Sequence, residues 1–109
     1  MNLRISRLAE EDLSHIYAHI AFHDAGAAER FRVEVEKAAS LLAKHPRLGP
    51  RPRWKTRHTR LRFWVISAFN NYLIYYEPLK DGVSIERVLD GRRDIRRIME
   101  HGLEEPSKE

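Results

Sequence analysis

The chain has 109 residues, a length that suits a single domain with one small hydrophobic core. A hydrophobic fraction of 42% is typical of folded proteins and argues against extensive disorder. The net charge of +4 is modest, and the absence of cysteine excludes disulfides and thiolate zinc sites.

The first 45 residues predict a short strand followed by two helices. Residues 2–6 alternate, with Leu3 and Ile5 on one side, which is typical of a strand. From residue 8 the apolar period becomes three and four, which predicts a helix, and Asp24 is suited to cap a second one. The pair His45-Pro46 ends that helix, because the residue before proline avoids helical angles. So few residues separate the helices that we expect an antiparallel hairpin.

A proline-rich basic loop follows, from residue 46 to residue 59. Acidic residues stop at Glu36 and resume at Glu77, and every charged residue between them is a lysine or an arginine. Charge of one sign attracts phosphate backbones or an acidic protein partner, although a solvated loop is the plain alternative.

The second half predicts three strands in a meander and a short helix. The strands are expected over residues 61–67, 72–77 and 83–90, because β-branched and aromatic residues are enriched there. Pro78 is expected to close the second strand. A helix over residues 94–101 would be capped by Asp94, with Gly102 as its C′ residue and a frayed tail from about residue 103.

The order of these elements predicts one α+β domain over residues 1–109. The N-terminal strand and the helical hairpin would pack on a mostly antiparallel sheet of about four strands, followed by a short C-terminal helix. No apolar run approaches the roughly 20 residues that span a membrane, and no signal-peptide core is seen, so a cytoplasmic protein is expected. His15, His19 and His23 recur every four residues without a matching carboxylate pattern, so we expect neither a metal nor a cofactor.

Several stretches of the chain share their pattern and order with one family of small bacterial proteins. They are Ala9, Asp12-Leu13 and Ile16; Ala27-Ala28 with Phe31; Leu42-Ala43 with His45-Pro46-Arg47-Leu48-Gly49; and residues 62–66, 72–76 and 85–95. Together they resemble the RelE/ParE superfamily of type II toxin–antitoxin modules, over about residues 3–98. The resemblance implies the RelE/ParE toxin fold and a cytoplasmic toxin that a ParD-like or Phd-like antitoxin neutralises.

Two activities are implied by the two branches of that superfamily. A ParE-like protein would inhibit DNA gyrase by binding, whereas a RelE-like protein would cut mRNA on the ribosome, which needs a base, an acid and cations at the phosphate. The candidates for that chemistry are Arg62, Arg87 and His58. No tyrosine follows Tyr76, and His101 is the only late histidine, so the sequence favours ParE. A third possibility is a toxin fold that only binds its antitoxin.

The expected contacts fall into two groups of residues. Those for the target are Arg57, Arg60, Arg62, Arg87, Arg92 and Arg93, and those for the antitoxin are Trp54, Arg47, Arg51 and Arg53. Plain alternatives remain for three candidates: Arg87 as the partner of a buried carboxylate such as Glu77, His58 as a solvated side chain, and Trp54 as a cover for the core.

Overall fold

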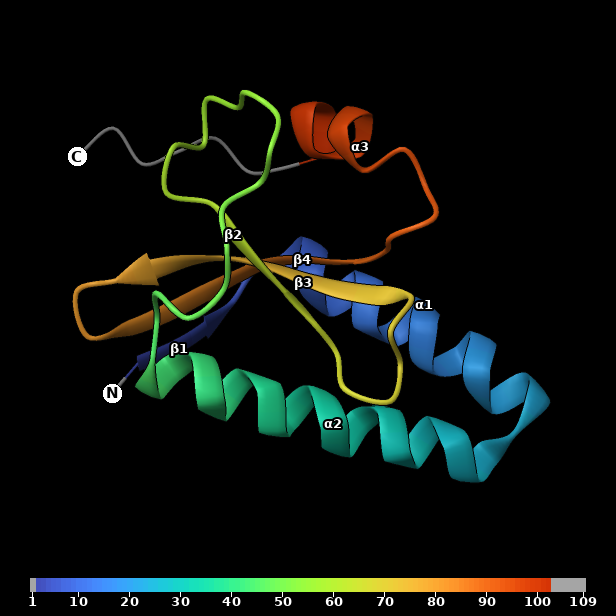
Figure 1. Ribbon diagram of the computed structural model, residues 1–109. Helices are drawn as coiled ribbons and strands as arrows, with labels where there is room; N and C mark the ends of the chain where they lie inside the picture. The colour runs from blue at the N-terminus through green and yellow to red at the C-terminus, as the bar shows by residue number, and fades with distance from the viewer. Residues whose placement is uncertain (1, 103–109) are drawn as a thin grey trace.

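The computed structural model describes residues 2–102 of the chain (Figure 1). In chain order the elements are β1 (Asn2–Ile5), α1 (Arg7–His23), α2 (Ala25–Lys44), β2 (Arg62–Val65), β3 (Tyr72–Leu79), β4 (Gly82–Asp90) and α3 (Ile95–Gly102). The predicted order and the α+β class are confirmed. The frayed tail predicted from residue 103 lies outside the described residues.

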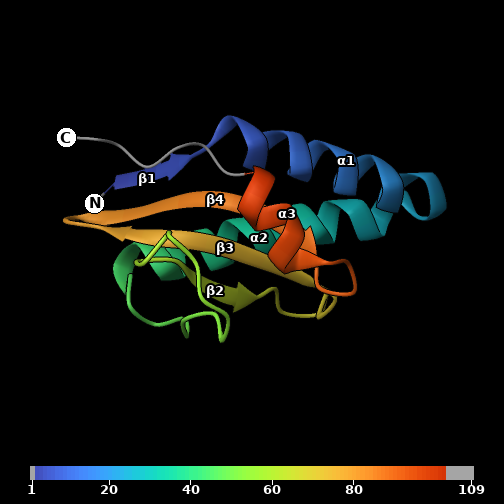
Figure 2. The same cartoon turned by 90° about the horizontal axis from the view of Figure 1, so that it is seen from above.

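The four strands form one sheet in the order β1-β4-β3-β2 (Figure 2). Only the β1–β4 pair is parallel, so the sheet is mostly antiparallel, as predicted. The prediction that Pro78 closes the second strand was wrong, because β3 continues to Leu79. Past Tyr76, β3 pairs with β4 alone, so a residue without an N–H fits there without breaking a two-sided ladder.

Gly82 begins β4 at the point where β1 comes closest. A Cβ atom at this position would lie 1.8 Å from the carbonyl oxygen of Asn2, which pairs with it in the sheet. The turn glycine is therefore needed for the parallel pairing as well as for the turn.

The two faces of the sheet are covered by different parts of the chain. In Figure 1, α1 and α2 lie on one face, and α3 with the loop between α2 and β2 lies on the other. The core under the two long helices includes Phe31, Leu42, Ile74, Tyr76, Ile85 and Val88. A second, smaller core on the loop side contains Leu61, Tyr75, Leu89, Ile95 and Met99. The central strands β3 and β4 are thus covered on both faces, whereas the edge strand β1 is exposed.

A single residue, Asp24, connects the two helices of the hairpin. Its backbone N–H donates to the carbonyl of Ile20 at 2.8 Å, which ends α1, and its carboxylate accepts from the N–H of Ala27 at 3.1 Å, which begins α2. The N-cap expected at this position is therefore confirmed. Ser6 caps α1 in the same way and also donates to the carbonyl of Glu86 on β4, which fixes the helix to the sheet.

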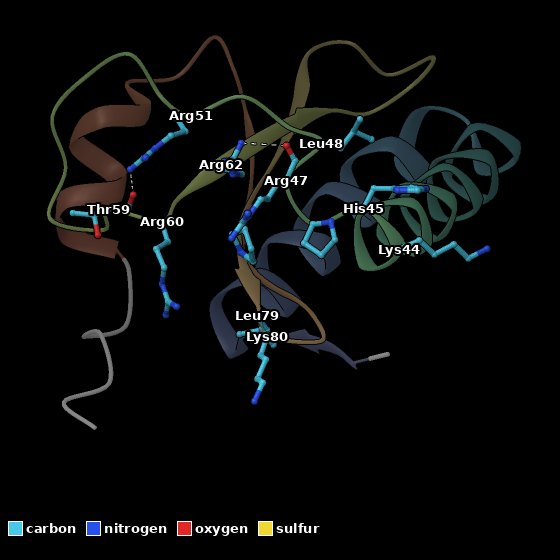
Figure 3. A pocket seen from close by; sticks show the side chains of 12 residues that line it. Lys44, His45, Arg47, Leu48, Arg51, Thr59, Arg60, Arg62, Leu79 and Lys80 are labelled. Carbon is cyan, nitrogen blue, oxygen red and sulfur yellow. Dashed lines mark hydrogen bonds between the residues drawn. The ribbon is translucent and has the colours of Figure 1, made fainter.

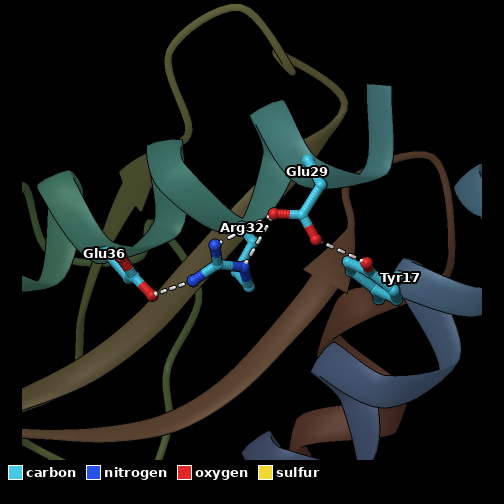
Figure 4. Close-up of polar contacts among 4 residues, drawn as sticks. All are labelled: Tyr17, Glu29, Arg32 and Glu36. Atoms are coloured by element: carbon cyan, nitrogen blue, oxygen red, sulfur yellow. Dashed lines mark hydrogen bonds and ion pairs between the residues drawn. The ribbon is translucent and has the colours of Figure 1, made fainter. Parts of the chain in front are cut away.

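A polar chain on the solvent side ties the two helices together (Figure 4). The Tyr17 hydroxyl donates to Glu29 at 2.7 Å, and Arg32 donates to both Glu29 and Glu36. The hydrogen bond with Glu29 raises the pKa of Tyr17, and the same bond lowers the pKa of Glu29. Because these groups are exposed, this series of polar contacts links the two helices but adds little stability.

Ala68, in the turn between β2 and β3, has a positive φ of 66°. An L-residue there is strained by roughly 1–2 kcal/mol, whereas glycine is not, so we expect Ala68→Gly to stabilise the protein by about 0.5–1 kcal/mol after the entropy of glycine is included. Urea denaturation measures this difference. The same substitution at the exposed helical residue Ala18 is the control and should destabilise by about 1 kcal/mol. Equal effects at both positions would contradict the proposed backbone strain at Ala68.

Candidate functional site

The face of the sheet beneath the basic loop is closed by apolar side chains. Trp54 is partly buried against the second core, with its ring centroid 6.2 Å from that of Tyr75. Burial raises the pKa of Tyr75 to about 12. The indole Nε1 of Trp54 is also buried and has no hydrogen-bond partner among residues 2–102. Trp54 therefore covers part of this face, as the plain alternative has it.

Arg87 holds the sheet to the first helix through a buried ion pair. Its Nε donates to Oδ2 of Asp12 at 2.7 Å, and its Nη2 donates to Oδ1 at 2.9 Å. The backbone N–H of Val88 donates to the same carboxylate at 3.0 Å. Both charged side chains are only 12–13% exposed. Arg87 thus pairs with a carboxylate, as the plain alternative has it, but the partner is Asp12 on α1 and not Glu77.

Arg62, the second candidate for catalysis, supports the main chain of the basic loop. Its Nη1 donates to the carbonyls of Gly49 at 2.8 Å and Arg47 at 3.2 Å. Gly49 in turn donates its N–H to the hydroxyl of Tyr76 at 2.8 Å. The start of β2 and the middle of β3 therefore fix the path of the loop as it leaves α2.

His58, the third candidate, is buried rather than solvated. The residue is 6% exposed, and its backbone N–H donates to the hydroxyl of Thr56 at 3.1 Å. The solvated alternative is therefore wrong for this residue. The three candidates occupy different local structures: a helix–strand ion pair, a loop support and a buried turn.

A wide hollow lies beside the basic loop, with a volume of about 1030 Å³ (Figure 3). We call it the basic groove, and its charged lining residues are Lys44, Arg47, Arg51, Arg60, Arg62 and Lys80, with His45 among the others. They come from the end of α2, the loop, the start of β2 and the β3–β4 turn. None of the twelve described residues that line it is acidic. Arg51 donates to the carbonyl of Thr59, which holds the loop closed across one wall.

Arg92 and Arg93 line a smaller hollow of about 210 Å³ beside α1, together with His15 and His19. Arg92 forms an ion pair with Asp90 at 2.7 Å, and this hydrogen bond lowers the pKa of Asp90. Arg93 is exposed. The expected target contacts are therefore divided between two hollows, since Arg60 and Arg62 lie in the basic groove.

Arg53 and Arg57 are exposed on the loop and line neither of these hollows. Arg47 and Arg51, expected to bind the antitoxin, share the basic groove with Arg60 and Arg62, expected to bind the target. Two predicted antitoxin contacts and two predicted target contacts therefore share one groove, and the remaining candidates lie elsewhere.

Comparison with known proteins decides the family. The model of a family described as ParE toxin of type II toxin–antitoxin system, parDE, matches residues 3–95. The chain belongs to the ParE toxin family. A solved structure described as "Chromosomal ParDE TA system from P. aeruginosa" has a TM-score of 0.67 and 16% identity, and the match covers 83% of this chain and 95% of that one. At that identity the similarity shows the shared fold alone. No curated protein matches the sequence.

Two features of this ParE family member were missed by the sequence analysis. Asp12 lies in the apolar stripe of α1, three residues after buried Ala9, and a carboxylate in such a place signals a buried partner. Lys80 and Lys44 join the basic groove from a turn and a helix end far apart in the chain, and no local pattern predicts that meeting. Within residues 2–102, no helix is long and apolar enough to cross a membrane, and no group of three potential ligands is placed to hold a metal.

Proposed function

We propose that the protein is a toxin that inhibits DNA gyrase by binding, and that a cognate antitoxin neutralises it. The observation that carries this proposal is that the three candidates for catalysis, Arg87, Arg62 and His58, have structural roles. Arg87 is held by Asp12, Arg62 supports backbone carbonyls, and His58 is buried. A ribosome-dependent nuclease needs an acid, a base and cations that reach one phosphate. Their engagement elsewhere favours an inhibitor that acts by contact, in keeping with membership of the ParE toxin family.

The antitoxin would neutralise the toxin by covering its target contacts. Arg47 and Arg51 would receive acidic side chains of a ParD-like or Phd-like antitoxin, and Arg53, which is exposed on the loop, would add a further contact. Because Arg60 and Arg62 line the same groove, a segment bound there also occludes the residues proposed to reach the target. Segments that fold on binding can cover such a surface together with neighbouring apolar patches.

The test is to add the full chain, made by cell-free synthesis, to gyrase with supercoiled plasmid and ATP, and separately to ribosomes translating a defined mRNA. We expect linear plasmid to accumulate after detergent and protease treatment, while the mRNA stays intact. Codon-level cuts in the mRNA would instead identify a nuclease. If the plasmid and the mRNA both stay intact, the protein has a toxin fold that only binds its antitoxin.

A variant locates the target contacts outside the groove. Arg92→Gln/Arg93→Gln should raise the concentration needed for plasmid cleavage by about 100-fold or more, since charge-assisted contacts contribute about 1.5–3 kcal/mol each. The matched control, Arg30→Gln/Lys37→Gln, removes the same charge from exposed positions on α2. Equal loss in both variants would place the effect in net charge and not in the proposed contacts.

A further inference from the structure

We propose that the basic groove binds the phosphate backbone of a nucleic-acid duplex. This inference goes beyond inhibition of gyrase and does not depend on it, because the binding needs no enzyme. It rests on the charge, the chemistry and the shape of the groove.

The charge of the groove exceeds that of the whole protein. Six lysine and arginine side chains line it, with no carboxylate among the lining residues, whereas the net charge of the chain is +4. Arg51 and Arg62 are partly occupied by backbone carbonyls. The other four, Lys44, Arg47, Arg60 and Lys80, form no ion pair or side-chain hydrogen bond with any residue in the range 2–102. In Figure 3 the side chains of Arg60 and Lys80 extend away from the ribbon on the same side.

The arrangement suits a uniform polyanion better than a small anion. Its volume of about 1030 Å³ is at the upper end of the range for small-molecule sites, and the cations come from four separate parts of the chain: the end of α2, the loop, the start of β2 and the β3–β4 turn. A duplex carries one charge for about every 1.7 Å of its axis, so separate cations each find a phosphate without exact spacing. Arginine forks bind phosphate oxygens through two hydrogen bonds, and Thr59 and His45 add polar groups to the walls.

The lining also selects between double and single strands. No phenylalanine, tyrosine or tryptophan is among the twelve described lining residues, so the ring of His45 is the one surface in this lining on which an unpaired base could stack. The two tryptophans and the tyrosines of the sheet pack in or against the two cores instead. Binding should therefore be directed at the backbone, independent of sequence and strongly dependent on salt.

The experiment is fluorescence anisotropy of a labelled 20-base-pair DNA duplex with the full chain, across a range of salt concentrations. With four phosphates neutralised, the logarithm of the binding constant should fall with the logarithm of salt at a slope of about −3.6. Arg60→Gln/Lys80→Gln removes two of these cations. The slope should become about −1.8, and affinity should fall about 60-fold at 0.1 M salt. A circular dichroism spectrum checks that the variant is folded.

Arg30→Gln/Lys37→Gln is again the matched control, because it removes one arginine and one lysine from α2 away from the groove. Its slope should stay near −3.6. Equal loss in the two variants would overturn the proposal, because it would show attraction by net charge alone. An RNA duplex of the same length tells which nucleic acid is preferred, and either preference supports the backbone site.

Two further results would overturn the proposal. One is a single strand that binds more tightly than the duplex, and the other is a polyglutamate of equal charge that does so. Polyglutamate tests the acidic side chains of a protein partner in isolation, without the apolar contacts that an antitoxin adds. None of these binding measurements contains gyrase, so they are independent of the gyrase assay described above. Duplex binding with no plasmid cleavage in that assay would reject the gyrase proposal alone. Plasmid cleavage with no duplex binding would reject the duplex proposal alone.

Discussion

Replacing Asp12 with alanine is expected to lower the free energy of unfolding by about 3–5 kcal/mol. The substitution removes the acceptor of two hydrogen bonds from Arg87 and one from the N–H of Val88, and it leaves a guanidinium that is 12% exposed without this counter-charge. Domains of this size have total stabilities of about 5–15 kcal/mol, so the variant should be close to its unfolding threshold. Urea denaturation followed by circular dichroism measures the change.

A second substitution separates the cost of breaking the pair from its net contribution. Arg87→Met in the Asp12→Ala background removes the guanidinium as well, and most of the lost stability should return, because apolar replacements of buried ion pairs are often neutral. A loss below about 1 kcal/mol for Asp12→Ala alone would mean that the pair is not buried in solution.

The same double variant tests the role of Arg87 in toxicity. Arg87→Ala alone is ambiguous, since a loss of toxicity would follow from unfolding as readily as from a lost contact. If Asp12→Ala/Arg87→Met is folded and still arrests growth, Arg87 is structural. If it is folded and harmless, Arg87 contacts the target as the sequence predicted.

The elements of the fold were predictable because their signals are local. The apolar periods, the cap at Asp24 and the His45-Pro46 stop each act within a few residues, and all three are present in the structure. Pro78 was misread because its fit depends on which strand lies beside it, and that is settled only when β2 ends its pairing at Tyr76.

The faces of the strands were harder to predict than the strands. Period-two alternation places Val83, Ile85 and Leu89 on one side of β4. A register shift opposite Tyr75 and Tyr76 breaks that alternation, so Val83 and Ile85 join the core under the helices and Leu89 joins the one under the loop. Such a bulge has no reliable sequence signal, because it arises from pairing between strands.

The candidate site was predictable only as a basic segment. Sequence located the charge of the loop, but not that its residues meet Lys44 and Lys80 in one groove. Nor did it show that Trp54 faces inward, since an aromatic in a loop is equally suited to a partner or to a core. These features depend on contacts between segments that are distant in the chain.

The path of the loop depends on Gly49, and Gly49→Ala is the second substitution with a large expected effect. A Cβ atom there would lie 2.2 Å from the carbonyl oxygen of Phe63 and 2.8 Å from the hydroxyl of Tyr76. Neither group can move freely, because one is backbone of β2 and the other is fully buried. The bond from the Gly49 N–H to Tyr76 would also be displaced. We expect a loss of about 2–4 kcal/mol in urea denaturation.

Gly26→Ala is the control, because its added Cβ would meet neighbours only at 3.4 Å in the first turn of α2, where alanine should be neutral or stabilise by up to about 1 kcal/mol.

Gly49→Ala should also weaken duplex binding beyond its effect on folding, because Arg62 donates to the carbonyl of Gly49 and the loop carries Arg47 and Arg51. Anisotropy at a temperature where the variant is fully folded measures that part. Unchanged stability would show that the loop is not held against Tyr76. Unchanged duplex affinity in a destabilised variant would show that the groove keeps its cations in place without that contact.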